Sequence, residues 1–368
     1  MSSAPDVTIR RALLSDEAAV MSLGDVYSGR DYLFALYSDL VQDPDTYPVV
    51  AVVNNVVVGF YLTEPFDGGV TVIKRAGRVA ESYRGRGVFH LMEAELERHT
   101  AHERSQVMYE AVARTDKVDH LIDRFLSKGY RPVYRKGIMN KLLKPSNYGR
   151  QGNNTHLTLD LKEMSRQDLS LMFHAENDEP RLFPQKRLFN FYLGYRLMDE
   201  NIPSILCKGG GAFYSATKND VRTDGCEPYH KPNGNVQSQN GSSHIRTIDN
   251  RSSSADSNMK AKINDVKRIA MVTFYRFLPT RTGYLYFLDV YATPEAVTSR
   301  DYLQSHLQRH LFTARRHFPK TNGILCVAHD LHIPKDLISS SLAQLGICED
   351  LEGQEDFQVL YEKNDIKR

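Results

Sequence analysis

The sequence lacks features that mark several large classes of protein. Its 368 residues contain only four cysteines, Cys207, Cys226, Cys326 and Cys348, and no two of them form a CxxC pair. This spacing argues against a zinc site and against a disulfide framework, and it fits a reducing compartment. The 47 basic residues nearly balance the 45 acidic ones. The chain therefore lacks the concentrated basic excess of a typical nucleic-acid-binding protein.

Long apolar runs are also missing. The first residues, MSSAPDVTIRR, contain no apolar secretory core. The longest apolar stretch, residues 49–62, is too short to span a bilayer, and it carries Asn54-Asn55, a pair typical of a hairpin turn. Because hydrophobic residues make up 41% of the chain and charged residues 25%, a packed core is expected. We therefore expect a soluble, cytoplasmic protein that binds neither a membrane nor nucleic acid.

The first part of the chain, residues 1–145, predicts alternating strands and helices in a mixed sheet. Hydrophobic periodicity and turn residues place these elements. Strands are expected at 7–10, 49–53, 56–63, 70–80 and 107–113, with a strand pair within 130–143. Helices are expected at 16–23, 31–41, 87–103 and 118–127. The linker PSNYGRQGNN then separates this part from the rest.

The second part, residues 155–365, predicts a similar series with a long interruption. Strands are expected at 267–278, 283–292, 323–329 and 357–363, and helices at 300–318 and 334–345. An insert at about residues 217–262 is rich in Asn, Ser, Gly and charge and poor in aliphatic residues. Such a segment cannot bury enough apolar surface to offset its ordering entropy, so the insert is predicted to be disordered.

The two parts share an internal pattern. The strands IKRAGRVA and VMYEAVA of the first part, each followed by a helix, correspond to YLYFLDVYA and GILCVAH in the second. The second part has TPEAVTSR where the first has ESYRGRG. We therefore predict an α/β protein of the α+β kind with a mixed sheet. It would consist of two tandem domains, of which the second is degenerate and lacks the glycine turn.

The stretch RVAESYRGRGVFHLM, residues 78–92, joins a predicted strand to a predicted helix. Gly85 and Gly87 would let the backbone approach a phosphate, to which the free N–H groups of the helix start would point. Arg84 and Arg86 would add attraction. The alternative is an ordinary turn with two surface arginines. A dinucleotide fingerprint is excluded because position 90 is His, and the Walker lysine motif is absent.

The sequence R-G-R-G-V resembles the acetyl-CoA pyrophosphate loop of the GNAT N-acetyltransferase superfamily, whose pattern is Gln/Arg-x-x-Gly-x-Gly/Ala. Arg84 takes the first place and Gly87 the fourth, whereas Phe89 departs from the pattern at the sixth. The order of elements and the segment RFLSKGY are also similar to that superfamily. The resemblance implies two acyl-CoA N-acyltransferase-like domains and acetyl-CoA as cosubstrate. It implies that the cofactor is bound by Val79, Ala80, Arg84, Gly85, Arg86, Gly87 and Val88.

A closer resemblance is to the vertebrate histidine N-acetyltransferase family. It is carried by YSGRDYL at residues 27–33, DPDTYPVVAV at residues 43–52 and GRVAESYRGRGV, and by YLYFLDVYATPEAVTSRDYLQSHLQRHL in the second part. The resemblance implies acetyl transfer from acetyl-CoA to the α-amine of a free amino acid, with histidine first. A protein or peptide acetyltransferase and a non-catalytic acetyl-CoA-binding module remain open as alternatives.

Two groups that the superfamily often uses are missing. The helix-end tyrosine that can protonate the leaving thiolate aligns with Phe125, and the strand before the loop carries no glutamate. A model α-amine has a pKa of about 7.7–8.0, whereas a lysine amine near 10.4 needs roughly three units of help. The missing groups therefore favour an α-amine acceptor over a lysine side chain.

The remaining site candidates follow from the chemistry of such a transfer. The oxyanion needs a donor, for which we expect the backbone N–H of Val79 or Ala80. The carboxylate of a free amino acid needs an arginine, for which Arg75 and Arg78 are candidates. Since they are three residues apart on a strand, we expect them on opposite faces.

An imidazole would need an acidic or aromatic partner. Tyr27, Asp31 and Tyr32 lie in the first helical hairpin, which borders the acceptor cleft in similar folds. Glu110 lies in the middle of the strand VMYEAVA, where a charge is unexpected if both faces are buried. It is a candidate catalytic base or imidazole partner, and an ion-paired glutamate is the alternative.

Two histidine pairs have the helical spacing of metal ligands. They are His99 with His102 and His306 with His310. Neither pair has a convincing third ligand, so we expect exposed helix faces and no metal.

Overall fold

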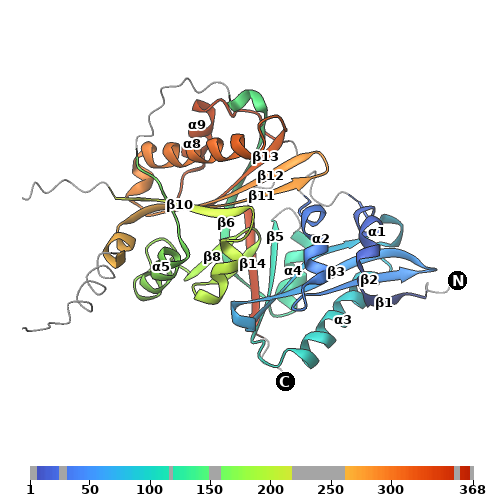
Figure 1. Ribbon diagram of the computed structural model, residues 1–368. Coiled ribbons are helices and arrows are strands. Elements are labelled where there is room, and N and C mark those ends of the chain that lie inside the picture. The colour runs from blue at the N-terminus through green and yellow to red at the C-terminus, as the bar shows by residue number, and fades with distance from the viewer. Residues whose placement is uncertain are drawn as a thin grey trace, which may run out of the picture.

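Strands from both parts of the chain form one continuous sheet. In the computed structural model twelve strands of the described residues follow the order β1-β2-β3-β4-β5-β14-β6-β13-β12-β11-β10-β7, and β8 and β9 form a separate hairpin (Figure 1). The structure describes residues 6–24, 31–115, 119–148, 159–217, 262–351 and 357–364. The predicted α/β architecture with a mixed sheet is thus confirmed.

The first lobe contains the strands and helices that the alternating pattern predicted. Its strands are β1 (Thr8–Arg11), β2 (Tyr47–Val53), β3 (Val56–Phe66), β4 (Thr71–Val79), β5 (Tyr109–Thr115) and β6 (Arg131–Leu143). Its helices are α1 (Glu17–Met21), α2 (Leu33–Gln42), α3 (Val88–Glu103) and α4 (Asp119–Ser127). Asn54 and Asn55 have φ values of 49° and 63°, which confirms the hairpin turn between β2 and β3. Helix α3 packs on one face of β2 and β3, and α1 and α2 pack on the other.

The second lobe repeats the arrangement of a sheet between helices. Its strands are β7 (Lys162–Glu163), β8 (Arg187–Asn190), β9 (Leu193–Arg196), β10 (Gly210–Ala216), β11 (Ile269–Thr280), β12 (Gly283–Ala292), β13 (Gly323–Asp330) and β14 (Phe357–Asn364). Its longer helices are α5 (Arg166–Asp178), α8 (Arg300–His317) and α9 (Lys335–Gln344), and α6 (Ile202–Ile205) is short. In the described ranges no helix is both long and apolar enough to cross a membrane. Residues 218–261 of the predicted insert lie outside the described residues.

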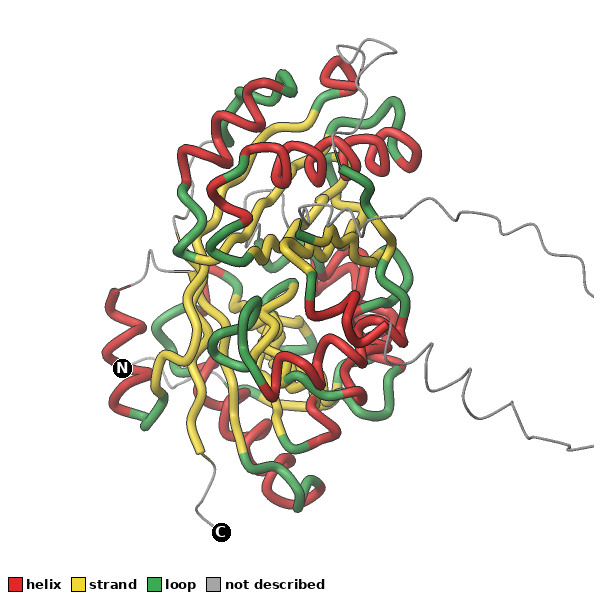
Figure 2. Tube along the Cα trace, turned by 90° about the vertical axis from the view of Figure 1, so that its left-hand side faces the viewer, coloured by secondary structure: helices red, strands yellow, loops and turns green. Residues whose placement is uncertain are grey.

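The two lobes exchange strands. The prediction of a strand pair within residues 130–143 is wrong, because β6 is a single strand that serves both lobes. Its residues 131–137 pair with β14, and its residues 136–143 pair with β13. The last strand of the chain, β14, therefore lies between β5 and β6, and β6 lies beside β13. Figure 2 shows strands passing from one lobe into the other. Although the chain divides at the linker, the sheet does not.

Each lobe contains one pair of parallel strands, and the two pairs differ in how many residues are hydrogen-bonded. In the second lobe, β12 pairs with β13 over seven positions, Tyr284–Val290 with Gly323–His329. In the first lobe, β4 pairs with β5 only over Thr71–Ile73. Beyond Ile73 the sheet of the first lobe opens, while that of the second lobe stays closed. The opened part of the sheet thus lies next to the glycine turn, which follows β4.

A β-bulge bends β4 just beyond this opening. The register with β3 shifts between Phe60 and Leu62, opposite Ala76 and Gly77. Ala76 has a φ of 60°, in the left-handed region that non-glycine residues rarely occupy. Such a conformation costs about 1–3 kcal/mol and is typically kept at functional sites. The bulge therefore marks the opened end of β4 as the place to look for chemistry.

Candidate active site

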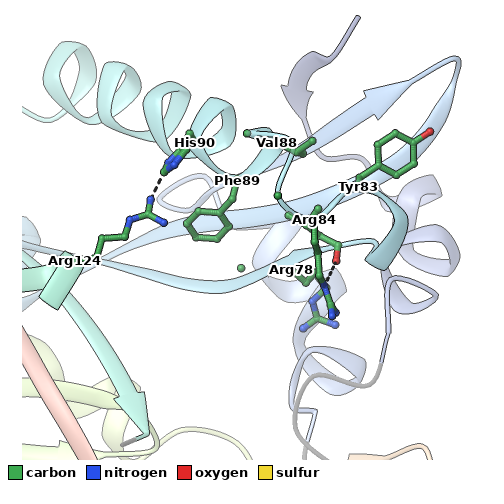
Figure 3. A pocket seen from close by; sticks show the side chains of 11 residues that line it. Arg78, Tyr83, Arg84, Val88, Phe89, His90 and Arg124 are labelled. Carbon is green, nitrogen blue, oxygen red and sulfur yellow. Dashed lines mark hydrogen bonds between the residues drawn. The ribbon is translucent and has the colours of Figure 1, made fainter. Parts of the chain in front are cut away.

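A large cavity of about 670 Å³ lies between the opened end of β4 and the start of α3. Figure 3 shows Phe89, His90 and Arg124 on one side of it and Tyr83 and Arg84 on the other. Its wall consists of Gly77, Arg78, Val79, Tyr83, Arg84, Gly85, Gly87, Val88, Phe89, His90 and Arg124. A volume of this size suits a cofactor-sized ligand.

The glycine turn forms the polar end of this cavity. Gly85 and Gly87 have φ values of 73° and 80°, so both positions require the freedom of glycine. Helix α3 begins at Val88, and the N–H groups of His90 and Leu91 both donate to the carbonyl of Gly87. The N–H groups of the helix start, before His90, have no intrahelical acceptor, which is an arrangement that suits an anion.

Of the two arginines in this turn, Arg84 lines the cavity and Arg86 does not. The Nε of Arg84 donates to the carbonyl of Val79 at 3.2 Å, which ties the turn to the end of β4. Arg86 lies over the ring of Tyr83, beside the cavity wall, at 5.6 Å. Of the residues predicted to bind the cofactor, Val79, Arg84, Gly85, Gly87 and Val88 line the cavity, whereas Ala80 and Arg86 do not.

Phe89, which departs from the loop pattern, packs against β4 and does not fill the turn. Its ring lies 4.7 Å from that of Tyr61, and a Cβ at Gly77 would come within 2.8 Å of it. The bulky residue on α3 is thus accommodated by a glycine on β4. Because the ring forms a wall of the cavity, it leaves the phosphate end open.

Helix α4 contributes a cavity residue that the sequence reasoning missed. The Nη2 of Arg124 lies 2.8 Å from the Nδ1 of His90 and 3.2 Å from a carboxylate oxygen of Glu93. Phe125 points away from the cavity and packs against Tyr130 and Tyr361. The sequence could have indicated Arg124 as a cavity residue, because it immediately precedes Phe125, the position that aligns with the missing tyrosine.

The backbone at the end of β4 presents one of the two predicted oxyanion donors. The N–H of Ala80 donates to the carbonyl of Val58 at 2.8 Å, so it is not available for a ligand. Donors in an antiparallel ladder alternate between the two edges of a strand. The N–H of Val79 therefore points to the opposite edge of β4, where β5 has separated and the cavity lies.

The expectation that Arg75 and Arg78 face opposite sides of the sheet is wrong. The bulge at Ala76 inserts one residue, so both arginines reach the same loop at the start of α2. Arg75 contacts Tyr32, and Arg78 contacts Asp31. The structure thus brings together four of the five predicted acceptor-side residues. The fifth, Tyr27, lies outside the described residues.

Arg78 is already paired. Its two terminal nitrogens bind the carboxylate of Asp31 at 2.8 and 3.2 Å, and the same carboxylate accepts the N–H of Leu33 at 3.0 Å. This bidentate pair fixes the start of α2 against β4. Arg78 and Asp31 therefore hold the wall of the site together.

Arg75 is buried, and one of its donors is unused. Its guanidinium stacks on the ring of Tyr32 at 4.5 Å, and its Nη1 donates to Glu64 at 2.8 Å. Its Nη2 is buried and has no hydrogen-bond partner. Burial opposes the charge, but Tyr32 and Glu64 outweigh it and hold the pKa of Arg75 above the ordinary arginine value. A charged donor left unsatisfied in this way suits an anionic ligand.

A narrow cavity of about 50 Å³ adjoins Arg75. Both cavities are bordered by Gly77, which lies in the bulge of β4. Its wall consists of Tyr32, Tyr61, Ile73, Lys74, Arg75, Ala76, Gly77, Val112, Ala113, Arg114 and Tyr192. Tyr192, which comes from the second lobe, was not predicted. The volume suits one small polar group such as a carboxylate.

Glu110 is held by ion pairs. Lys74 and Lys363 lie 2.6 and 2.9 Å from its oxygens, and Tyr130 donates to it. Burial alone would raise the pKa of Glu110, but the charges of Lys74 and Lys363 outweigh it, so its pKa is lowered. Its contacts match the ion-paired alternative rather than those of a base. Lys363 is on β14, so the exchanged strand supplies one of the partners.

The helical histidine pair His306 and His310 differs from expectation, whereas His102 is exposed as expected and His99 is half-buried. His306 and His310 are buried, not exposed, and both bond to the hydroxyl of Thr273 at 2.8 Å. Burial lowers the pKa of His306 to about 3. Within the described residues, no three His, Cys, Asp or Glu side chains are grouped so that they could hold a metal ion.

Two curated proteins resemble part of the chain. A human protein named probable N-acetyltransferase 16 is 34% identical over 116 residues, which cover 32% of this chain and 30% of that protein. A Xenopus tropicalis protein named histidine N-acetyltransferase is 31% identical over 114 residues, which cover 31% of this chain and 34% of that protein. Each match thus spans about a third of the relative's own length. No protein-family model matches the chain.

Solved structures share the fold over the whole chain. A tandem GNAT protein from the clavulanic acid biosynthesis pathway has a TM-score of 0.52 at 11% identity and covers 99% of this chain and 100% of its own. A GCN5-related N-acetyltransferase from Sphaerobacter thermophilus has a TM-score of 0.50 at 11% identity, with 98% and 97% covered. The resemblance noted from the sequence is confirmed: the chain has the tandem GNAT fold, and about a third of it is similar in sequence to curated N-acetyltransferases.

Proposed function

We propose that this chain is an acetyl-CoA-dependent N-acetyltransferase that acetylates the α-amine of a free amino acid, L-histidine first. The observation that carries the proposal is Arg75, a residue that lines the narrow cavity and whose buried Nη2 has no hydrogen-bond partner. This donor needs an anionic acceptor. A free amino acid offers one, because its carboxylate lies close to the amine that is to be acetylated. The name of the Xenopus tropicalis relative supports histidine as the acceptor.

The residues of the large cavity fit acetyl-CoA. Its pyrophosphate would bind at the left-handed glycines Gly85 and Gly87 and at the N–H groups of the α3 start, with Arg84 adding charge. The pantetheine arm would run along the opened edge of β4 toward Gly77. When bound, acetyl-CoA supplies the thioester as an activated acetyl group.

The acceptor would reach the thioester from the narrow cavity. Its carboxylate would accept hydrogen bonds from Arg75, and its amine would point past Gly77 to the thioester. The N–H of Val79 would then donate to the carbonyl oxygen as negative charge develops on it. In the transfer the nitrogen–acetyl bond forms and the carbon–sulfur bond breaks. A proton leaves the amine, and the coenzyme A thiol is released.

The proposed transfer does not depend on a dedicated general base. A model α-amine has a pKa of about 7.7–8.0, so on the order of a tenth is neutral at pH 7, and the amine of a free amino acid is somewhat harder to deprotonate. Holding an amine against a thioester can contribute up to about 7–11 kcal/mol, compared with roughly 3–5 kcal/mol from a general base. The ion-paired state of Glu110 is therefore compatible with turnover.

A competition between free amino acids and peptides for the acetyl group tests this proposal. The protein is incubated with acetyl-CoA, an equimolar mixture of free amino acids and a set of unrelated peptides, and acetylated products are identified by mass spectrometry. We expect N-acetylhistidine to dominate. Acetylated peptides with no acetylated amino acid would favour a protein acetyltransferase. Binding of acetyl-CoA without any acetylated product would point to a non-catalytic module.

A further inference from the structure

The turn between β8 and β9 carries an unusual pair of residues. Asn190 pairs with Leu193, so Phe191 and Tyr192 alone form the turn. Their φ values are 47° and 66°, so both are in the left-handed region. Two-residue hairpins of this type favour Asn-Gly, because bulky side chains at these positions are strained. The two aromatic residues therefore adopt a backbone conformation that their side chains disfavour.

Buried contacts from strands β12 and β6 and from the start of helix α2 hold this turn in place. Phe191 is buried and packs on the rings of Tyr32 and Phe287 at 5.7 and 5.5 Å. Its N–H donates to the carboxylate of Asp289 on β12. The same carboxylate is 2.9 Å from the Nζ of Lys136 on β6, and both charges are buried. The shared sheet thus anchors the turn through a buried ion pair.

The strained turn places Tyr192 at the narrow cavity. Tyr192 lines that cavity together with Tyr32 and Arg75, although it comes from the second lobe. Its ring centroid lies 6.2 Å from that of Tyr32, with the two planes tilted by 33°. A ligand that binds Arg75 therefore lies beside two tyrosine rings, one from each lobe. Strain of this kind is typical of sites where position serves function.

We infer that the second lobe sets the acceptor class of the enzyme through Tyr192. The inference rests on the proposed function and goes further, because it names a specificity residue and a side-chain type. Because the narrow cavity suits only the carboxylate, the side chain of an amino acid bound to Arg75 would extend out of it past the rings of Tyr192 and Tyr32. Flat rings stack favourably on such aromatic faces. Planar aromatic or heteroaromatic amino acids are thus preferred over aliphatic ones.

The variant Tyr192→Gly separates this role from a structural one. Glycine suits a φ of 66° better than tyrosine, which offsets part of the packing lost with the ring of Phe287 at 5.4 Å, so the melting temperature should fall by only a few degrees. The KM for histidine should rise about tenfold, as expected for loss of an aromatic stacking partner. The KM values for alanine and acetyl-CoA should not change. Tyr192→Phe keeps the ring and should retain the wild-type KM for histidine.

A matched control is available in the first lobe. Asn55 occupies the second position of the β2–β3 turn with a φ of 63°, away from both cavities. Asn55→Gly makes the same kind of backbone change and should leave every KM unaltered. The inference is overturned if Tyr192→Gly leaves the KM for histidine unchanged or raises the KM for alanine equally. Failure of the proposed function is distinct, because the wild-type protein itself would then acetylate no free amino acid.

Discussion

Replacing Arg75 with lysine is expected to remove the recognition of a carboxylate while leaving a positive charge beside Glu64. The lost contact is a hydrogen bond between charged groups, which contributes about 1.5–3 kcal/mol. That range corresponds to roughly a 10- to 100-fold change in kcat/KM. Lysine lacks the planar fork of arginine, so its single nitrogen cannot occupy both the Nη1 position beside Glu64 and the Nη2 position assigned to the ligand.

The assay compares histidine with histidinamide, which keeps the amine and the imidazole but has no carboxylate. The wild-type enzyme should prefer histidine by roughly the factor just given, and Arg75→Lys should lose most of that preference. Arg78→Lys is the matched control, because Arg78 lies on the same face of β4 but is bound by Asp31. If Arg75→Lys kept the full preference for histidine, the assignment of its Nη2 to the acceptor carboxylate would be refuted.

Three further changes test the cavity wall and the buried histidines. Gly87→Val should weaken acetyl-CoA binding at least tenfold, because Gly87 has a φ of 80° and faces the phosphate site; calorimetry measures this. Gly77→Ala should also weaken binding, since its Cβ would meet Phe89 at 2.8 Å, and Phe89→Leu should partly restore it. Burial lowers the pKa of His306 to about 3 and that of His329 to about 4. Both are neutral when folded and become charged when unfolded, so each should reduce the free energy of unfolding by about 1.4 kcal/mol per pH unit below pH 6.5, as measured by urea titration.

Each of these three predictions has a control variant or an outcome that would contradict it. Gly129→Val alters a glycine with a φ of 86° that follows α4, so it should leave acetyl-CoA affinity intact. Equal losses from Gly129→Val and Gly87→Val would mean that only folding was affected. Failure of Phe89→Leu to improve Gly77→Ala would contradict the steric account. A free energy of unfolding that stays constant between pH 6.5 and 5 would contradict neutral buried histidines.

The elements of the first lobe were predictable because their signals are local. Asn54-Asn55 marks a left-handed turn, and the glycines of the 84–88 loop mark both a turn and a helix start. These features depend on neighbours in the sequence, so periodicity and turn chemistry reach them. The absence of a glycine turn from the second lobe was also predictable from local sequence, since TPEAVTSR stands there in place of ESYRGRG.

The parts that escaped prediction depend on distant partners. Strand β6 is long because β13 and β14, from the far end of the chain, bind its two halves. The shared face of Arg75 and Arg78 results from a bulge at Ala76, whose identity gives no hint of a left-handed φ. The turn of Phe191 and Tyr192 opposes local preference and is held by Asp289. Tertiary contacts therefore decided the acceptor side of the site, while local sequence decided the phosphate side.

The rate of thiol release from acetyl-CoA tests the central claim most directly. It is measured with free histidine, with histidinamide and with a peptide that carries an N-terminal histidine. The account predicts that kcat/KM is highest for free histidine, because only this acceptor offers Arg75 a carboxylate beside a reactive α-amine. Equal or faster release with the peptide, or no release with any free amino acid, would contradict it.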